Sequence, residues 1–183
     1  MYILPLPDLN YLKECFEIDN DFDSGLKWKT RPTKHFKSDF LCSAWNKRFS
    51  TKQAGFNIGN DYYSVSLNYK QHLCHRIVYA LYNDTTDFHG MFVDHKDGNT
   101  KNNNPLNLRL ANLSQNKFNS KLYKSNKSGH KNISYCEKKK KFKIRITQNN
   151  KSIFSKSFLT LEEAIEARNQ KIKELAGEFY RTI

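Results

Sequence analysis

The stretch FVDHKDGNTKNNNPLNLRLANLSQNKFNS, residues 92–120, constrains the fold most because its composition changes in a defined order. A short apolar run ends at the pair Asp94-His95, and a loop rich in turn-forming Asp, Gly, Asn and Pro follows. Leucine then occupies every second position of residues 106–110, as in a strand with one buried face. The order predicts two short strands joined by a loop.

A helix is predicted to follow the second strand. Asn112 and Gln115 have the spacing of a capping box, in which each side chain bonds the backbone NH of the other residue. Asn116 and Asn119 then lie one turn apart on the same helix face. The stretch holds eight asparagines, and those within residues 99–104 are expected only to shape the loop, because asparagine tolerates left-handed backbone.

Asp94 and His95 suit the hydrolysis of a phosphodiester bond. Neighbouring residues on a strand point to opposite faces, so the carboxylate and the imidazole can serve different partners. An imidazole titrates near neutral pH and can take a proton from an attacking water. Mg²⁺ prefers oxygen ligands and keeps several waters, so Asp94 and one amide oxygen, from Asn116 or Asn119, would be a sufficient protein contribution.

The segment VDHKDGNTKNNNPLNLRLANLSQNKFN resembles the HNH endonuclease motif in the variant of phage-borne homing endonucleases, and the resemblance covers residues 74–120. The resemblance implies a ββα-metal core and cleavage that leaves a 3′-hydroxyl and a 5′-phosphate. It implies His95 as the general base, with Asp94 and Asn116 as metal ligands. It also implies that Asn107 hydrogen-bonds the loop and orients the base.

Three further residues are candidates for a second ligand or a phosphate contact, namely Asn119, His75 and Arg76. The pair His75-Arg76 stands before an apolar helix, as in the phage pattern, and its side chains either pack near the site or bind phosphate. The third letter of the motif is asparagine in this chain. That favours one Mg²⁺, with Mn²⁺ as the alternative, over Zn²⁺.

The cysteines at positions 15, 42, 74 and 136 lie far apart and form no C-x-x-C pair, so neither a structural zinc nor a disulfide framework is expected. They are interpreted as thiols in a reducing cytoplasm. The compact group His72, Cys74 and His75 remains an alternative metal site.

Residues 25–70 are predicted to form short strands and turns. Residues 54–70 contain Gly-Asn-Asp between two β-rich runs, which indicates a hairpin. Residues 74–83 then change to the period of a short helix. The first 30 residues hold three Lys and six acidic residues, so we do not expect them to contact phosphate.

The segment from about residue 125 to 183 resembles an AP2-type DNA-binding domain, through SGHKNISYCEKKKKFKIRI, KSFLTLEEAIEARNQ and GEF. The chain departs from the family at GHKNI, where Gly-Val is usual. The alternation of cations with apolar residues along 141–146 predicts a strand with one basic and one apolar face. Three strands and one helix, which Thr160 and Glu163 are expected to begin with a capping box, form a complete module that leaves the basic face exposed. The candidate DNA-binding residues are Arg109, Lys117, Lys139, Lys141, Lys143 and Arg145.

The charge balance, 31 Lys+Arg against 18 Asp+Glu for a net +13, favours a polyanionic partner. The sequence contains no run of 18 apolar residues, so no membrane-spanning segment is expected. The N-terminus lacks the basic region and the cleavage site of a signal peptide. Double-stranded DNA is therefore the expected partner, with no membrane and no small-molecule cofactor, in the cytoplasm of a host cell.

The pattern as a whole predicts an α+β chain with three parts: an N-terminal β-rich region over 1–70, an HNH core over 71–122 and an AP2-like domain over 123–183. The expected function is a metal-dependent DNA endonuclease, of the homing type of phages or mobile elements, acting as a monomer or homodimer. Two alternatives remain: a dimeric HNH restriction enzyme, and a non-catalytic DNA-binding regulator.

Overall fold

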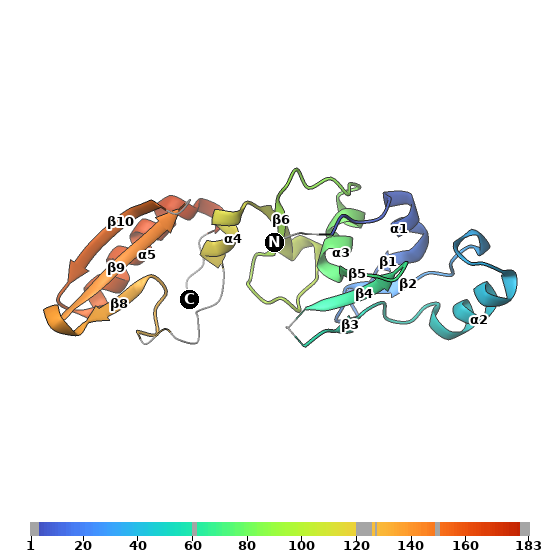
Figure 1. Cartoon of the computed structure of the whole chain (residues 1–183), viewed down its shortest axis with the longest axis horizontal. Helices are drawn as coiled ribbons and strands as arrows, with labels where there is room; N and C mark the ends of the chain where they lie inside the picture. The colour runs from blue at the N-terminus through green and yellow to red at the C-terminus, as the bar shows by residue number, and fades with distance from the viewer. Residues whose placement is uncertain (1–3, 60–61, 120–125, 127, 149–150, 180–183) are drawn as a thin grey trace. The chain divides into compact units, whose positions relative to one another are not determined.

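The computed structural model describes residues 4–59, 62–119, 126, 128–148 and 151–179. The chain divides into two compact units, Met1–Leu110 and Ala111–Ile183, and each is described by itself (Figure 1). Both units combine helices with small sheets, which agrees with the mixed helix and strand content of the predicted α+β class. The predicted domain boundaries, after residues 70 and 122, stay predictions.

The first unit is built from short elements. In chain order they are α1 (Leu9–Cys15), β1 (Phe16–Ile18), β2 (Leu26–Trp28), η1 (Thr33–His35), α2 (Asp39–Phe49), β3 (Phe56–Asn57), β4 (Tyr63–Leu67), β5 (Lys70–Leu73), α3 (Cys74–Tyr82), β6 (Phe92–His95), η2 (Pro105–Asn107) and β7 (Leu108–Ala111). They form three small sheets, β1-β2, β3-β4-β5 and β6-β7.

Helix α3 organises the first unit. Its residues Ile77, Val78 and Ala80 are fully buried, and the helix contacts α1, β1, the β4-β5 hairpin, β6 and η2. The predicted helix over 74–83 agrees with α3, and the predicted hairpin within residues 54–70 agrees with the antiparallel pair β3-β4. Strand β6, which carries Asp94 and His95, is therefore held against the most buried helix of the unit.

The prediction of only strands and turns between residues 25 and 70 was wrong, because α2 occupies part of that range. Ser38 caps the helix by accepting a hydrogen bond from the NH of Leu41. Cys42, Trp45 and Phe49 recur at helical spacing and form its inner face. The sequence did not reveal this pattern, because the neighbouring residues Phe40 and Leu41 are also apolar although they lie exposed.

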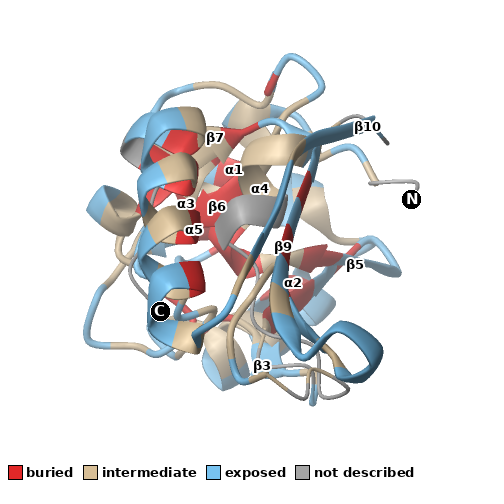
Figure 2. Cartoon of the chain, turned by 90° about the vertical axis from the view of Figure 1, so that its left-hand side faces the viewer, coloured by how far each residue is buried: buried red, intermediate tan, exposed pale blue. Residues whose placement is uncertain are grey.

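The second unit contains α4 (Leu113–Asn119), β8 (Ile133–Cys136), η3 (Glu137–Lys139), β9 (Lys141–Gln148), β10 (Lys151–Phe158), α5 (Leu161–Ala176) and η4 (Gly177–Phe179). The strands form an antiparallel sheet in the order β10-β9-β8, and α5 packs on it. Thr160 and Glu163 cap α5 with the predicted capping box. Strand β9 alternates between buried and exposed residues, and β10 is exposed along most of its length (Figure 2).

Three strands and one helix thus enclose a small core around Ile133, Ile144, Ile146 and Ile172. Within the described ranges, no helix is long and apolar enough to cross a membrane.

Candidate active site

Strand β6 places Asp94 and His95 together, and both side chains are buried, with residue exposures of 7% and 3%. Burial of two such polar residues at a strand end is costly unless hydrogen bonds or ion pairs compensate. Arg109 on β7 is a partner of Asp94, and Asn103 in the loop that follows β6 is a partner of His95.

The partner of His95 is Asn103, a loop residue that is only 3% exposed. The His95 Nε2 atom lies 3.0 Å from Asn103 Oδ1. The amide of Asn103 also donates from Nδ2 to the backbone oxygen of Ser24 at 2.9 Å. The base is thereby linked through one side chain to a turn that lies 79 residues away from Asn103 in sequence.

These two hydrogen bonds fix the tautomer of His95. The Ser24 carbonyl can only accept, so the Asn103 NH₂ group faces Ser24 and its oxygen faces the imidazole. An amide oxygen can only accept, so His95 Nε2 must carry a proton. The neutral imidazole therefore has its lone pair on Nδ1, the atom able to take a proton.

The environment keeps His95 neutral near neutral pH. Burial lowers the pKa of His95, and the hydrogen bond with Asn103 and the carboxylates of Asp94 and Asp97 offset only part of this. A general base must be unprotonated at the start of the reaction. The direction of the shift therefore favours a base.

Asn107 holds the loop between β6 and β7. Its side chain accepts from the NH of Asp97 at 3.1 Å and donates to Asp97 Oδ1 at 3.0 Å and to the backbone oxygen of Asn102 at 2.8 Å. Its backbone oxygen accepts from the NH of Lys96 at 2.8 Å. The two tasks expected of Asn107 are thus divided: it braces the loop, and Asn103 contacts the imidazole.

The carboxyl group of Asp97 belongs to the same loop network. Burial raises the pKa of Asp97, but hydrogen bonds from Asn102, the NH of Asn99 and Asn107 outweigh it, and the net pKa is lowered. An ionised Asp97 stabilises this loop conformation because it accepts all three hydrogen bonds.

Two rings pack beside His95. The ring centroid of His75 lies 5.0 Å from that of His95, and the Tyr62 ring lies 5.4 Å from His75 and 6.2 Å from His95. Burial, together with the charges of His95 and Arg76, holds the pKa of His75 well below its usual value. His75 is therefore a neutral, packed neighbour of the base.

The guanidinium of Arg76 contacts Leu4 and Phe88. It donates to the backbone oxygen of Leu4 at 2.6 Å and lies 5.5 Å from the ring centroid of Phe88. These contacts tie the N-terminal segment to α3. The sequence left open whether the His75 and Arg76 side chains pack near the site or bind phosphate. The contacts of both side chains are packing contacts within the first unit.

Asp94 forms an ion pair with Arg109, with Nε and Oδ2 separated by 3.2 Å. Arg109 was predicted to bind DNA, and the structure places it beside the predicted metal ligand instead of on an open surface. A carboxylate oxygen is the kind of ligand that a hard cation such as Mg²⁺ or Mn²⁺ prefers.

The other predicted ligand, Asn116, lies half-buried on α4 in the second unit. The predicted capping box of this helix is present: the NH of Asn112 donates to Gln115 Oε1 at 2.8 Å, and the NH of Gln115 donates to Asn112 Oδ1 at 2.9 Å. The side chains of Asn119 and Lys117 lie outside the described residues. Their roles, and the ligand pair of Asp94 with Asn116, stay predictions.

The group His72, Cys74 and His75 does not have the character of a metal site. Burial raises the pKa of the Cys74 thiol to about 12, so the thiol stays protonated. No cluster of three or more His, Cys, Asp or Glu side chains suited to a metal occurs among the described residues. His72 is a buried residue of β5.

The predicted cations of the second unit lie on the solvent face of its sheet. Lys141, Lys143 and Arg145 are exposed on the central strand β9 and alternate with Phe142, Ile144 and Ile146 on the covered face. Lys143 stands opposite Ser134 on β8 and Ser157 on β10, and Arg145 stands opposite Ser155. Lys139 is exposed on the turn η3. Short hydroxyl side chains thus flank a row of longer cations.

Sequence reasoning missed Asn103 and the residue that supports it, Gly25. The backbone of Gly25 has a φ of +73°, and an added Cβ would lie 2.9 Å from the Cβ of Asn103. Nothing in the run Asn102-Asn103-Asn104 indicated that Asn103 would bond His95, because only the fold brings the Ser24 carbonyl close to its side chain. A glycine before a strand was the one available signal.

Comparison with known proteins supports a nuclease. The sequence model of a family described as HNH endonuclease matches residues 72–117. The chain is 35% identical over 122 residues to an uncharacterized HNH endonuclease of Acanthamoeba polyphaga mimivirus, an alignment that covers 67% of this chain and 63% of that protein. It is also 35% identical over 92 residues to Protein 3.8 of Escherichia phage T7, covering 50% of this chain and 75% of the phage protein. No solved structure matches the chain.

The matched segment contains the buried pair Asp94-His95, the brace Asn107 and the orienting Asn103. The chain spans less than two thirds of the mimivirus protein and three quarters of the phage protein. Site geometry and similarity agree on one segment: residues 72–117 of the chain match the HNH endonuclease family.

Proposed function

We propose that this protein hydrolyses phosphodiester bonds of double-stranded DNA, with His95 as the general base. The observation that carries the proposal is the chain of hydrogen bonds from His95 through Asn103 to the Ser24 carbonyl. A histidine that serves only to fill a core needs no fixed tautomer, whereas a base must present a lone pair in one direction.

In this proposal His95 takes a proton from water at Nδ1 as the water oxygen attacks phosphorus. The O–H bond of water breaks, an N–H bond forms on the imidazole, and the water oxygen forms a bond to phosphorus. The bond from phosphorus to the 3′ oxygen breaks, and this oxygen takes a proton from solvent water, which leaves a 3′-hydroxyl and a 5′-phosphate. The Nε2 proton stays on the hydrogen bond to Asn103 throughout. The resulting imidazolium is stabilised by the nearby carboxylates of Asp94 and Asp97.

One divalent cation, Mg²⁺ in preference to Mn²⁺, would be held by Asp94 and Asn116. Such an ion supplies charge stabilisation for the phosphate and for the leaving oxygen. Arg109 shares the carboxylate of Asp94 and limits its movement. His75 and Tyr62 shield the imidazole from bulk water on one side.

Affinity for DNA is assigned to the second unit, which we propose is AP2-like in fold and function. Lys141, Lys143 and Arg145 present three cations along one exposed strand, and phosphate contacts of this kind dominate DNA affinity. Viral relatives favour the homing type, acting in the cytoplasm of a host cell, over a restriction enzyme.

The proposal is tested with supercoiled plasmid and with pooled viral genomic DNA, incubated with wild-type protein in Mg²⁺ and in EDTA. Nicked or linear products that form only with Mg²⁺ support it. Tight binding of both DNAs without any cleavage would contradict it and favour a DNA-binding regulator.

A further inference from the structure

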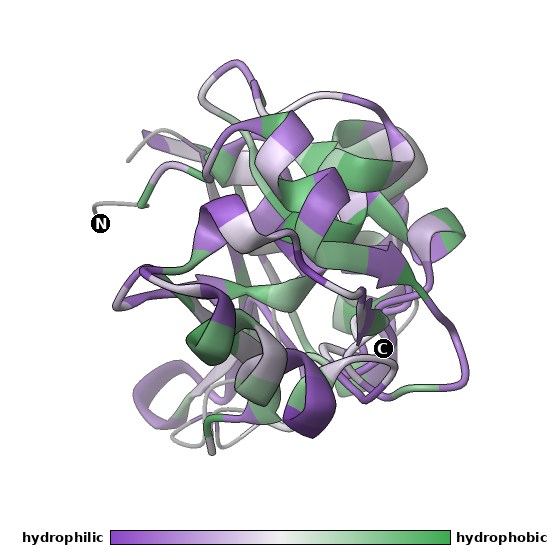
Figure 3. Ribbon diagram, turned by 90° about the vertical axis from the view of Figure 1, so that its right-hand side faces the viewer, coloured by the Kyte–Doolittle hydropathy of each residue, from purple (hydrophilic) through white to green (hydrophobic). Residues whose placement is uncertain are grey.

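The helix α2 of the first unit carries an outer face that the nuclease chemistry does not use. Phe40, Ser43, Ala44 and Lys47 follow one another at helical spacing, and each is exposed. Phe40 is 79% exposed and its neighbour Leu41 is 46% exposed. Phe40 lies on the same helix as the exposed cations Lys47 and Arg48, so this face combines an apolar ring with positive charge. Figure 3 views the chain from the side on which α2 lies in Figure 1, and the ribbon on that side carries both hydrophilic and hydrophobic residues.

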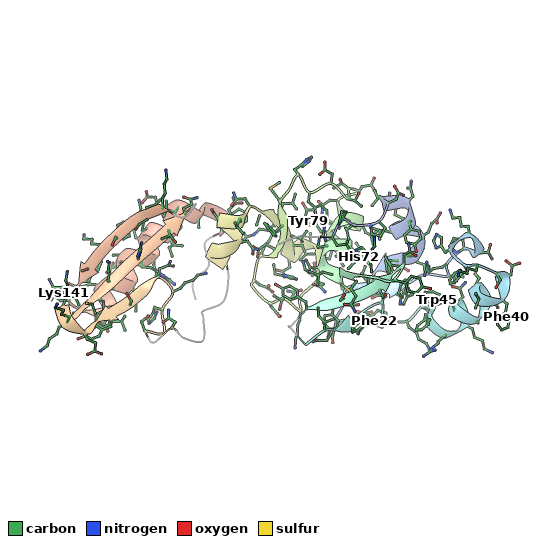
Figure 4. All side chains as sticks on the ribbon, in the orientation of Figure 1. Phe22, Phe40, Trp45, His72, Tyr79 and Lys141 are labelled. Carbon is green, nitrogen blue, oxygen red and sulfur yellow. The ribbon has the colours of Figure 1, made fainter. Side chains whose placement is uncertain are left out.

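The inner face of the same helix is fixed firmly. The side chain of Asn46 accepts from the NH of Arg31 and donates to its carbonyl, both at 2.9 Å. The Trp45 ring packs 4.8 Å from Trp28 and 5.1 Å from Phe49, and the Arg31 guanidinium lies 4.9 Å from its centroid. Figure 4 shows Phe40 on the outer side of α2 and Trp45 on the side of β2. The unit thus presents α2 as a rigid element with one side exposed.

The charge around α2 is strongly positive. Residues 37–52 contain the four cations Lys37, Lys47, Arg48 and Lys52 and a single acid, Asp39. Within the described parts of the chain, none of these four cations is in an ion pair, in contrast to Lys13, Lys27 and Lys34 of the same unit. Unpaired cations on one surface form a site for a polyanion.

We propose that the outer face of α2 is a second contact surface for duplex DNA, separate from the sheet of the second unit. Lys47 and Arg48 contact phosphates, and the small side chains of Ser43 and Ala44 let the helix approach a groove closely. Phe40 packs against sugars or a thymine methyl at the groove wall. This inference rests on the proposed action on DNA, and it extends the DNA contact to the unit that holds His95.

A second copy of the chain fits this face less well than DNA does. Two copies of α2 would bring like charges together, and the whole chain carries a net charge of +13. Duplex DNA supplies the opposite charge at regular spacing, and a major groove accepts an α-helix.

The test uses full-length protein in the His95→Ala background, so that DNA stays intact during titration. A duplex of about 40 base pairs, roughly four helical turns, is titrated at several salt concentrations between about 50 and 200 mM. The variant Lys47→Ala with Arg48→Ala is expected to bind roughly tenfold more weakly and to lower the salt slope by about 2.

The matched control is Lys13→Ala with Lys27→Ala, which removes the same charge from the same unit at two cations already paired with acids. Its binding curve is expected to stay close to that of the parent. Equal loss in both double variants would overturn the proposal, because net charge alone would then explain it. Unchanged binding in the α2 variant would also overturn it.

Phe40→Ser separates DNA binding from self-association. Weaker DNA binding by a protein of unchanged mass in sedimentation supports the proposal. Conversion of an oligomer to a monomer, with DNA binding intact, would overturn it and make the face an interface between copies. The two proposals can fail separately. If the wild-type protein never cuts DNA but the α2 variant still loses DNA binding, the proposed α2 surface is supported and the nuclease proposal is contradicted.

Discussion

The two units place polar chemistry in opposite surroundings. The first unit buries Asp94, His95 and Asn103 and carries 14 Lys/Arg against 12 Asp/Glu, a net +2. The second carries 17 Lys/Arg against 6 Asp/Glu, a net +11, and exposes its key cations on β9. Buried groups are fixed in direction by their partners, whereas exposed cations act at longer range and are screened by salt. We therefore expect the cleavage rate to depend on the buried residues of the first unit and DNA affinity to depend on the exposed cations of the second.

The largest effect expected within this comparison is on the rate, from Asn103→Ala. Loss of the hydrogen bond to Nε2 frees the His95 ring to rotate and to change tautomer, and misplacement of a catalytic group can cost roughly 100-fold in rate. Single-turnover cleavage measures the rate, and a DNA titration should show unchanged affinity. Asn99→Ala is the control, since Asn99 is an exposed asparagine of the same loop, and a comparable loss of rate in that variant would contradict the assignment.

The next effect is on affinity, from Lys143→Ala with Arg145→Ala. Removing two phosphate contacts should weaken binding roughly tenfold and lower the salt slope by about 2, with the rate on saturating DNA unchanged. A filter-binding titration at several salt concentrations measures both. Lys171→Ala with Lys173→Ala, on α5 away from the sheet face, should leave binding nearly unchanged. If Lys143→Ala with Arg145→Ala cut saturating DNA more slowly, the assignment of rate to the first unit and of affinity to the second would be contradicted.

A moderate effect is expected from Gly25→Ala, which tests whether the turn before β2 supports the base. Left-handed backbone and the contact with Asn103 should together lower the free energy of unfolding by about 1–3 kcal/mol and slow cleavage. Gly90→Ala isolates the backbone cost, because Gly90 has a φ of +71° with nothing within 4 Å of an added Cβ. Chemical denaturation and single-turnover rates should show a stability loss in both variants and slower cleavage only in Gly25→Ala.

The smallest effect is on stability at mildly acidic pH. Burial, with the charges of Arg76 and Lys70, lowers the pKa of His72 in the folded state, so the unfolded chain takes up the proton first as the pH falls. Stability from this residue is present above the unfolded pKa of about 6.5 and declines below it. His72→Phe should therefore flatten the loss of stability between neutral and mildly acidic pH in urea titrations. If the stability of His72→Phe fell more steeply with falling pH than that of wild type, the assigned direction of the His72 pKa shift would be wrong.

Local patterns predicted much of the second unit. The alternation around Ile144 and the capping box at Thr160 both concern neighbours in sequence, and the observed strand and helix follow them. Asp94 and His95 were also identifiable, because the chemistry of a carboxylate beside an imidazole is carried by the residues themselves. Their burial at the end of β6 required the fold.

Two features could not be predicted because they depend on distant contacts. Asn103 differs from the asparagines beside it only through the Ser24 carbonyl, which the packing of the β1-β2 turn brings close. Helix α2 was missed because the apolar residues Phe40 and Leu41 lie exposed near its start, so no single hydrophobic face stood out. Both features lie in the first unit, whose small sheets are assembled from segments far apart in the chain.

The most direct test of the central claim compares binding and cleavage for wild type and His95→Ala on the same pool of genomic fragments in Mg²⁺. A base stabilises the transition state and contributes little to ground-state affinity. We expect His95→Ala to bind like wild type and to cut at least about 100-fold more slowly. Cleavage by His95→Ala at the wild-type rate would contradict the role of His95 as the general base.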